Sequence, residues 1–348
     1  MWLNRNPEGI LRTILGGMAS TELTSGAKTL ILFRRLAAAT AFATFALIVV
    51  GGIVRVSESG LGCGPAGSGL EGWPLCTGRV VPSVGGATLV EFTHRVLAGL
   101  VAVLVVLLAW QAFRNLRDRP WLVRGSAFTV VLVLIQAGLG GLTVEHNLHA
   151  TLVAVHLGIA MILLALLLGM YRAANPGPQP EAGRASAGLK ATAAIAAFLV
   201  LATIVVGGYV AGTEGEGTAD KPSGGAHTAC GTDFPTCGDE LLPYGRDSMV
   251  DAQLTHRVLM FAASVSVLAM LALALMRGIR GWPAITAGGL VLLQVLLGAL
   301  NIWLGKHAGL IIGHLTLGTL VWAVVVWAGI TYTRFPGPER SGAPPRPA

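Results

Sequence analysis

The chain has 348 residues, of which 53% are hydrophobic and only 12% are charged. Soluble globular proteins carry about 25% charged residues, so the composition argues against a soluble fold. The formal net charge of +7 would suggest nucleic-acid binding in a soluble protein. In a membrane protein it must first be sorted by membrane side.

Apolar stretches recur along the whole chain, and each has about the 20 residues that an α-helix needs to cross a bilayer. We predict an all-α polytopic membrane protein with spans at 36–54, 90–112, 126–144, 150–171, 191–211, 253–276, 283–302 and 308–332. Residues 1–27 lack the compact apolar core of a signal peptide and are interpreted as a polar tail. The proline-rich residues 335–348 are predicted to be disordered.

The charged residues predict the orientation of these spans. With both tails in the cytoplasm, the inner segments hold most of the basic residues, among them Arg34, Arg35, Arg117, Arg172 and Arg277. The outer segments hold most of the acidic ones, among them Glu58, Glu71, Glu214, Asp233 and Asp247. Because Lys and Arg near span ends stay on the cytoplasmic side, we expect a plasma-membrane protein with both termini in the cytoplasm. The basic charge then reflects topology, and no nucleic-acid partner is expected.

The two halves of the sequence repeat each other. The matched landmarks, in the same order, are Ile48-Val49-Val50-Gly51-Gly52 with Ile204-Val205-Val206-Gly207-Gly208, Phe92-Thr93-His94-Arg95 with Leu254-Thr255-His256-Arg257, Gln136 with Gln294, and His156-Leu157 with His314-Leu315. Each half holds an even number of spans, so both copies have the same orientation and are related by an axis along the membrane normal. We predict two tandem four-helix bundles at 36–172 and 191–333, with cytoplasmic segments at 1–35 and 173–190 and a C-terminal tail at 334–348.

Four histidines lie within apolar spans at equivalent places of the repeat, namely His94, His156, His256 and His314. An ionisable side chain in a bilayer is costly unless it pairs or binds a ligand. A lone histidine bonded to a neighbouring helix explains any one of them, but not four matched ones. Two imidazoles from facing helices suit axial ligation of heme iron. Zinc normally takes three or four protein ligands, and these spans contain no further His or Cys.

Arg95 and Arg257 directly follow the first histidine of each pair. Two interpretations remain open for them. The side chains either extend to the membrane interface or pair with heme propionates, whose carboxylates match guanidinium groups well.

The repeat is broken one helical turn before the first histidine of each half. Glu91 stands there in the first half, and Gln253 in the second. Glutamine has nearly the shape of glutamate but does not ionise, so only the N-terminal site has a carboxylate that can move protons. Glu91 is therefore the candidate catalytic residue, although a carboxylate at this depth can also simply be solvated.

The outer loops hold the cysteines in pairs, Cys63 with Cys76 and Cys230 with Cys237. An extracytoplasmic setting favours two disulfides that close loops over the sites. A redox-active thiol pair, above all at Cys63 and Cys76, is the alternative. The chain lacks the Cys-Xaa-Xaa-Cys-His attachment motif, so heme would be held without a covalent bond.

These residues resemble the heme A synthase family of bacterial and mitochondrial membranes. The resemblance covers roughly residues 36–332 and rests on Gly51-Gly52, Val54-Arg55, Ser59-Gly60-Leu61 with Cys63, Glu91-Phe92-Thr93-His94-Arg95, His156, Thr255-His256-Arg257 and His314. It implies an enzyme that oxidises the C8 methyl group of heme O to a formyl group, giving heme A for aa3-type terminal oxidases.

By this resemblance, His94 and His156 flank the substrate heme O, Glu91 is catalytic, and His256 and His314 ligate a permanent heme B. Heme O synthase and the assembly of cytochrome oxidase are the expected partners, and the electron donor stays unknown. The segment from Gly64 to Leu75 makes the first cysteine loop wider than is usual in this family.

Two other classes of protein compete with this interpretation. A diheme b-type electron-transfer protein shares the four histidines but predicts equivalent sites, and it gives no reason for the difference between Glu91 and Gln253. A transporter with parallel repeats would favour broken helices at the midplane of the membrane. The ionisable groups of this chain instead gather toward the outer face.

Overall fold

The computed structural model describes residues 7–83, 85–174, 179–213, 225–305 and 307–333, and these residues form helices joined by loops and no β-strand. Eight helices are long and apolar enough to cross a membrane. They are α1 (Pro7–Val56), α2 (Gly86–Asn115), α3 (Pro120–Glu145), α4 (Ala150–Ala173), α6 (Ala187–Gly212), α7 (Ser248–Met276), α8 (Trp282–Trp303) and α9 (Ala308–Thr331). Three short helices are η1 (Gly69–Glu71), α5 (Pro180–Arg184) and η2 (Ala226–Thr228). The predicted all-α membrane fold is confirmed.

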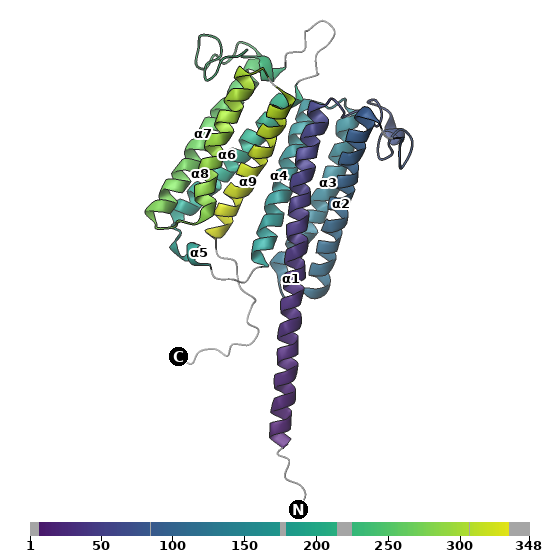
Figure 1. Ribbon diagram of the computed structural model, residues 1–348, viewed down its shortest axis with the longest axis vertical. Helices are drawn as coiled ribbons and strands as arrows, with labels where there is room; N and C mark the ends of the chain where they lie inside the picture. Colours follow the sequence, from purple (N-terminus) through teal and green to yellow (C-terminus); the bar gives the residue numbers. More distant parts are fainter. Residues whose placement is uncertain (1–6, 84, 175–178, 214–224, 306, 334–348) are drawn as a thin grey trace, which may run out of the picture.

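The helix boundaries follow the predicted spans closely except at the start of the chain. We expected a polar tail up to residue 27 and a first span at 36–54, whereas α1 is helical from Pro7, and its candidate span begins at Gly26. Its first turns project well beyond the other helices (Figure 1). Helix formation is cooperative, so turns continue past the apolar window that marks a span. The predicted disordered tail at 334–348 lies outside the described residues.

Local signals in the sequence start several of the helices. Asp247 caps α7, because its carboxylate accepts a hydrogen bond from the N–H of Met249 at 2.7 Å. Ser186 caps α6 in the same way by accepting from the N–H of Leu189. Pro120 occupies the first turn of α3, where its missing N–H costs nothing.

The long helices form two rings of four that stand side by side (Figure 1). In the first ring, contacts run from α1 to α2, α3, α4 and back to α1. In the second, they run from α6 to α7, α8, α9 and back to α6. Consequently α2 lies diagonally opposite α4, and α7 lies diagonally opposite α9. Each ring therefore places its second and fourth helices across a shared interior.

The two rings meet along α1, α4, α6 and α9. The indole Nε1 of Trp322 donates a hydrogen bond to the backbone oxygen of Met161 at 2.8 Å across this boundary. Arg55 of α1 donates to the backbone oxygens of Ala211 and Gly212 at the end of α6. These carbonyls have no partner within their own helix, so the guanidinium of one half caps a helix of the other.

Matched residues make matched contacts at this boundary. Gly52 packs against Leu315, and Gly208 packs against Leu157. A twofold arrangement requires such paired contacts, although the axis itself stays a prediction. Large apolar side chains such as Phe42, Trp110 and Phe198 point outward and are more than half exposed. Outward-facing apolar side chains of this size are what a lipid-facing surface needs, and the protein is a multi-pass membrane protein.

Candidate functional site

The four intramembrane histidines lie on the diagonal helices of the two rings. His94 and His156 stand on α2 and α4, and His256 and His314 stand on α7 and α9. The helices α2 and α4 lie across the interior of the first ring, and α7 and α9 lie across that of the second. The structure therefore brings the predicted residues together in two pairs, one in each ring.

Every one of these imidazoles packs against a glycine of the neighbouring helix. A Cβ atom added to Gly51, Gly140, Gly207 or Gly298 would lie 3.2, 3.8, 2.8 or 3.0 Å from Cε1 of His94, His156, His256 or His314, respectively. A Cβ atom at Gly207 would be too close to His256, and one at Gly51 or Gly298 would be tight, whereas the distance at Gly140 is an ordinary contact. Three of the four glycines thus allow a close approach between a helix and an imidazole.

The Nδ1 atoms of the four imidazoles differ in their hydrogen bonds. Among the described residues, Nδ1 of His94, His156 and His314 is buried without a hydrogen-bond partner. Nδ1 of His256 lies 3.1 Å from the backbone oxygen of Thr203 on α6. An Nδ1–H bonded to a carbonyl leaves Nε2 as the nitrogen with a free lone pair, which is the arrangement that favours a metal ligand.

The third helix of each ring carries one glutamine, which holds the helix of the second histidine, His156 or His314. The amide Nε2 of Gln136 donates to the backbone oxygen of His156 at 2.9 Å, and that of Gln294 donates to the backbone oxygen of His314 at 3.0 Å. Gln294 Nε2 also lies 3.2 Å from Nε2 of His314. Sequence reasoning found these glutamines as a repeat landmark but did not assign them this role, because only packing shows what a buried amide contacts.

The donor set fits heme better than a bare metal ion. Each ring offers two imidazoles across its interior, and most of their Nδ1 atoms lack a protein partner. Within the described parts of the chain, no group of three or more His, Cys, Asp or Glu could hold a metal ion. Axial heme ligation needs only one or two protein nitrogens, because the porphyrin supplies the other ligands.

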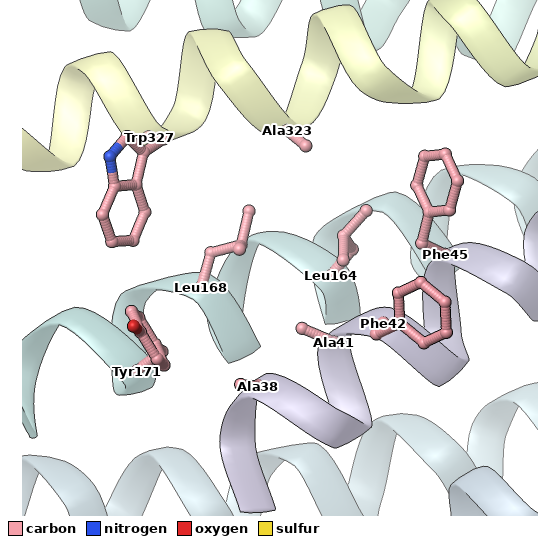
Figure 2. Close-up of a pocket in the computed structure, with 9 residues that line it drawn as sticks. All are labelled: Ala38, Ala41, Phe42, Phe45, Leu164, Leu168, Tyr171, Ala323 and Trp327. Atoms are coloured by element: carbon pink, nitrogen blue, oxygen red, sulfur yellow. The ribbon is translucent and has the colours of Figure 1, made fainter. Parts of the chain in front are cut away.

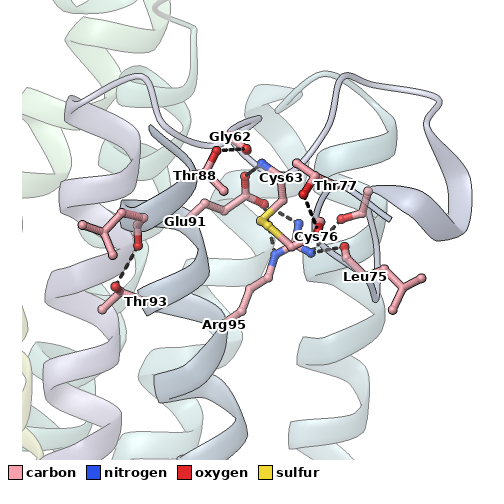
Figure 3. Close-up of a disulfide and its surroundings, with 11 residues drawn as sticks. Gly62, Cys63, Leu75, Cys76, Thr77, Thr88, Glu91, Thr93 and Arg95 are labelled. Carbon is pink, nitrogen blue, oxygen red and sulfur yellow. Dashed lines mark hydrogen bonds and ion pairs between the residues drawn. A yellow bond between two sulfur atoms is a disulfide. The ribbon is translucent and has the colours of Figure 1, made fainter. Parts of the chain in front are cut away.

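Glu91 lies at the top of α2, beneath the first cysteine loop (Figure 3), with only 4% of its surface exposed. One carboxylate oxygen accepts a hydrogen bond from the backbone N–H of Cys63 at 2.7 Å. The other pairs with Arg95, one turn later on the same helix. Such partners offset the cost of burying a carboxylate, and the loop and the arginine hold Glu91 in place beneath the loop.

Arg95 connects Glu91 to the loop. Besides the carboxylate, its guanidinium donates to the backbone oxygens of Gly72 and Leu75 at 2.6 and 2.8 Å (Figure 3). The propionate contact that the sequence suggested for this residue stays a prediction. In this structure the guanidinium nitrogens are occupied by the carboxylate and the loop.

The second half repeats the arginine but not the ion pair. Arg257 donates to the backbone oxygens of Pro235 and Thr236 and lies over the ring of Phe234. Its Nε and Nη2 are buried without a hydrogen-bond partner among the described residues. Gln253 is equally buried, with 3% exposed, and its Oε1 also has no partner there.

Both cysteine pairs form disulfides. Cys63 is bonded to Cys76, and Cys230 is bonded to Cys237, so the described residues contain no free thiol. Each loop also contains one isolated β-bridge. It joins Cys76 to Arg79 in the first loop and Cys237 to Glu240 in the second. The predicted pairing is confirmed.

Each loop places an aromatic side chain over its ring of helices. Trp73 packs against Gly141 near the end of α3, where a Cβ atom would lie only 2.9 Å from the indole. Phe234 stacks with Phe261 of α7 and contacts Trp303 of α8 edge-on. The segment from Gly64 to Leu75 thus packs against α3 and supplies both of the loop carbonyls that Arg95 contacts.

Comparison with known proteins adds independent evidence. The model of the COX15-CtaA family, described as a cytochrome oxidase assembly protein, matches residues 83–326. This range contains the four histidines and Glu91, whereas all of α1 and the first disulfide loop precede it.

Several relatives carry the name heme A synthase. The chain is 28% identical over 228 residues to the protein of Shouchella clausii, a match that covers 64% of this chain and 70% of that relative. It is 30% identical over 218 residues to the protein of Halalkalibacterium halodurans, covering 61% and 66%. It is 30% identical over 225 residues to that of Alkalihalophilus pseudofirmus, covering 63% and 68%. The resemblance to this family, expected from the motifs, is confirmed, and the chain belongs to the COX15-CtaA family of cytochrome oxidase assembly proteins.

Proposed function

We propose that this protein is a heme A synthase, which oxidises the C8 methyl group of heme O to a formyl group and so supplies heme A to aa3-type cytochrome oxidases. The relatives named heme A synthase support the general activity. The observation that carries the proposal is the unequal pair of sites. Both rings hold two histidines against glycines, but among the described residues only the first ring has a buried carboxylate.

The first ring is the substrate site. His94 and His156 hold heme O from opposite helices, and the loop closed by Cys63 and Cys76 covers the ring above them. Converting a methyl group to a formyl group is a four-electron oxidation, R–CH3 + H2O → R–CHO + 4 H+ + 4 e−, so it needs a proton acceptor at the site and an external electron acceptor. Glu91 is the proton acceptor, held between the N–H of Cys63 and the guanidinium of Arg95.

The second ring is the electron-transfer site. His256 and His314 hold heme B, which supplies a one-electron redox centre when bound. Thr203 fixes the tautomer of His256, because its backbone oxygen accepts from Nδ1. Gln294 fixes the helix that carries His314. Gln253 keeps the volume of the matching glutamate without a charge that would bind protons there.

The membrane setting suits this substrate. Heme O carries a farnesyl tail, which is apolar and is accommodated between helices or in lipid. A water-soluble enzyme would have to extract this tail from the bilayer. Handing the product to the oxidase within the same membrane avoids that cost.

The experiment is to express the protein together with a heme O synthase and to extract and separate the bound hemes by chromatography. We expect heme A to accumulate with the natural sequence. Glu91→Gln should abolish it while bound heme B remains. Unchanged heme A in this variant would refute the catalytic assignment.

The same extraction tests the alternative from another class. A diheme b-type electron-transfer protein would show two unmodified heme B groups per chain and no heme A under any condition. The four similar contacts between histidine and glycine would then serve two equivalent electron-transfer sites.

A further inference from the structure

An apolar cavity of about 280 Å³ lies between the two rings, at the end of the bundle opposite the disulfide loops. Figure 2 shows α1, α4 and α9 around it. Its lining side chains are apolar except for the hydroxyl of Tyr171 and the indole N–H of Trp327, and they include Ala38, Phe42, Leu168 and Ala323. Phe42 is 74% exposed, so the cavity opens to the lipid-facing surface.

The matching boundary between α4 and α6 is packed through small residues in the half nearer the disulfide loops. Gly212 packs against Ala150, Gly208 against Ala154, and Gly158 against Val205. Aromatic residues instead separate the helices at the cavity, where Tyr171 and Trp327 stand 5.8 Å apart between ring centroids.

The repeat shows how the two boundaries came to differ. At the offset that matches His156 with His314, Tyr171 corresponds to Gly329, and Trp327 corresponds to Gly169. Two aromatic rings at one boundary therefore replace two glycines at the other. Gly169 packs against Trp121 and Gly329 against Ala193, whereas Tyr171 and Trp327 line the cavity.

Two positive charges lie just beyond the end of this cavity that Ala38 and Tyr171 line. Arg34 and Arg35 precede Ala38 by four and three residues on α1, so they continue the same face of the helix by about one turn of roughly 5.4 Å. Arg35 is exposed and Arg34 is partly exposed. Tyr171 and Trp327 lie at this same end (Figure 2), as aromatic side chains do at membrane interfaces.

We propose that this cavity binds one anionic phospholipid, with an acyl chain between α1, α4 and α9 and the phosphate at Arg34 and Arg35. Basic residues beside a gap between transmembrane helices recruit anionic head groups, and an apolar lining accepts the chain. The lipid fills the boundary that side chains leave open and joins the two rings on that side. The site is separate from the histidines and does not depend on the proposed enzymatic activity.

The test uses the full-length protein in nanodiscs that contain equal parts of palmitoyl-oleoyl phosphatidylglycerol and phosphatidylcholine. Native mass spectrometry after detergent release counts the lipids that remain bound. We expect one phosphatidylglycerol to be retained by the natural sequence. The double variant Arg34→Gln and Arg35→Gln should lower its retention roughly tenfold, since each basic residue near the surface adds severalfold to the affinity for anionic lipid.

Cavity-filling variants test the position of the acyl chain. Ala38→Leu and Ala323→Leu place larger side chains in the cavity, so lipid retention should fall although both arginines remain. Ala194→Leu is the matched control, because Ala194 is the exposed counterpart of Ala38 on α6. Arg277→Gln with Arg280→Gln controls for the loss of two charges elsewhere and should leave retention unchanged.

Three results would overturn the proposal. One is equal retention of phosphatidylcholine and phosphatidylglycerol, and another is retention that the arginine and cavity-filling variants leave unaltered. The third is loss of the bound lipid when heme O is added, which would assign the cavity to the farnesyl tail of the substrate. A variant that fails to fold would be recognised by its thermal unfolding, and the remaining variants would still decide the result.

Discussion

The two arginines that follow the first histidine of each ring have the same neighbours in the chain but different partners. Both donate to backbone oxygens of the disulfide loop above them, Arg95 to Gly72 and Leu75, and Arg257 to Pro235 and Thr236. Only Arg95 also pairs with a carboxylate. The comparison separates two tasks, because fastening the loop to the helix is common to both halves, whereas holding a charge beneath the loop belongs to the first half alone.

The difference extends to the disulfides. The N–H of Cys63 donates to Glu91, so the first disulfide loop positions the carboxylate directly. In the second half, Oε1 of Gln253 has no hydrogen-bond partner within the described residues. The second loop therefore covers its ring without contributing to a charged site.

Replacing one histidine in each ring should distinguish the proposed functions of the two rings most clearly. His256→Ala should lose the spectrum of the permanent heme, because one of two axial nitrogens is gone. His94→Ala should keep that spectrum and lose heme A formation. Reduced-minus-oxidised absorption spectra and heme extraction measure the two properties, and a full spectrum in His256→Ala would contradict the assignment of the second ring.

Exchanging the acidic and amide residues asks whether the carboxylate or its setting matters. The double variant Glu91→Gln with Gln253→Glu keeps the composition of the two sites but should lose heme A formation by about 10²–10⁴-fold, which is the usual contribution of general acid–base catalysis. The single variant Gln253→Glu, with Glu91 in place, should stay within severalfold of the natural protein. Heme A formation by the double variant would show that position in the chain does not decide the catalytic site.

The two disulfides should differ in function although both affect stability. Replacing Cys63 and Cys76 by Ala should lower both the free energy of unfolding, by about 2–4 kcal/mol, and the yield of heme A, because the loop no longer holds Glu91. The same change at Cys230 and Cys237 should lower stability with a smaller loss of product. Thermal unfolding and heme extraction on both variants provide the comparison, and equal losses of product would remove the distinction between the loops.

The smallest expected effect concerns the fork of the two arginines. Arg95→Lys keeps the charge, but an ammonium group lacks the planar set of donors that reaches Glu91 and two carbonyls at once. We expect heme A formation to fall severalfold, whereas Arg257→Lys should change it little. The rate of product formation measures both, and an equal loss in both variants would mean that fastening the loop matters more than holding the carboxylate.

The sequence predicted most helix positions because membrane spans are encoded locally. The span expected at 150–171 became α4, Ala150–Ala173, and that expected at 308–332 became α9, Ala308–Thr331. Prediction was worst at α1, where a long polar segment before the apolar window is helical. An apolar window marks where a helix crosses lipid, not where its hydrogen bonds begin.

The sequence by itself determined that the chain crosses a membrane, that its halves repeat, and that Glu91 of one copy corresponds in position to Gln253 of the other. These are properties of residue type and spacing, and they need no knowledge of packing. Only the tertiary structure decided that glycines press on the four imidazoles, that Cys63 and Arg95 hold Glu91, and that one boundary between the rings stays open. Such contacts join residues far apart in the chain, and they depend on how side-chain volumes fit when helices pack.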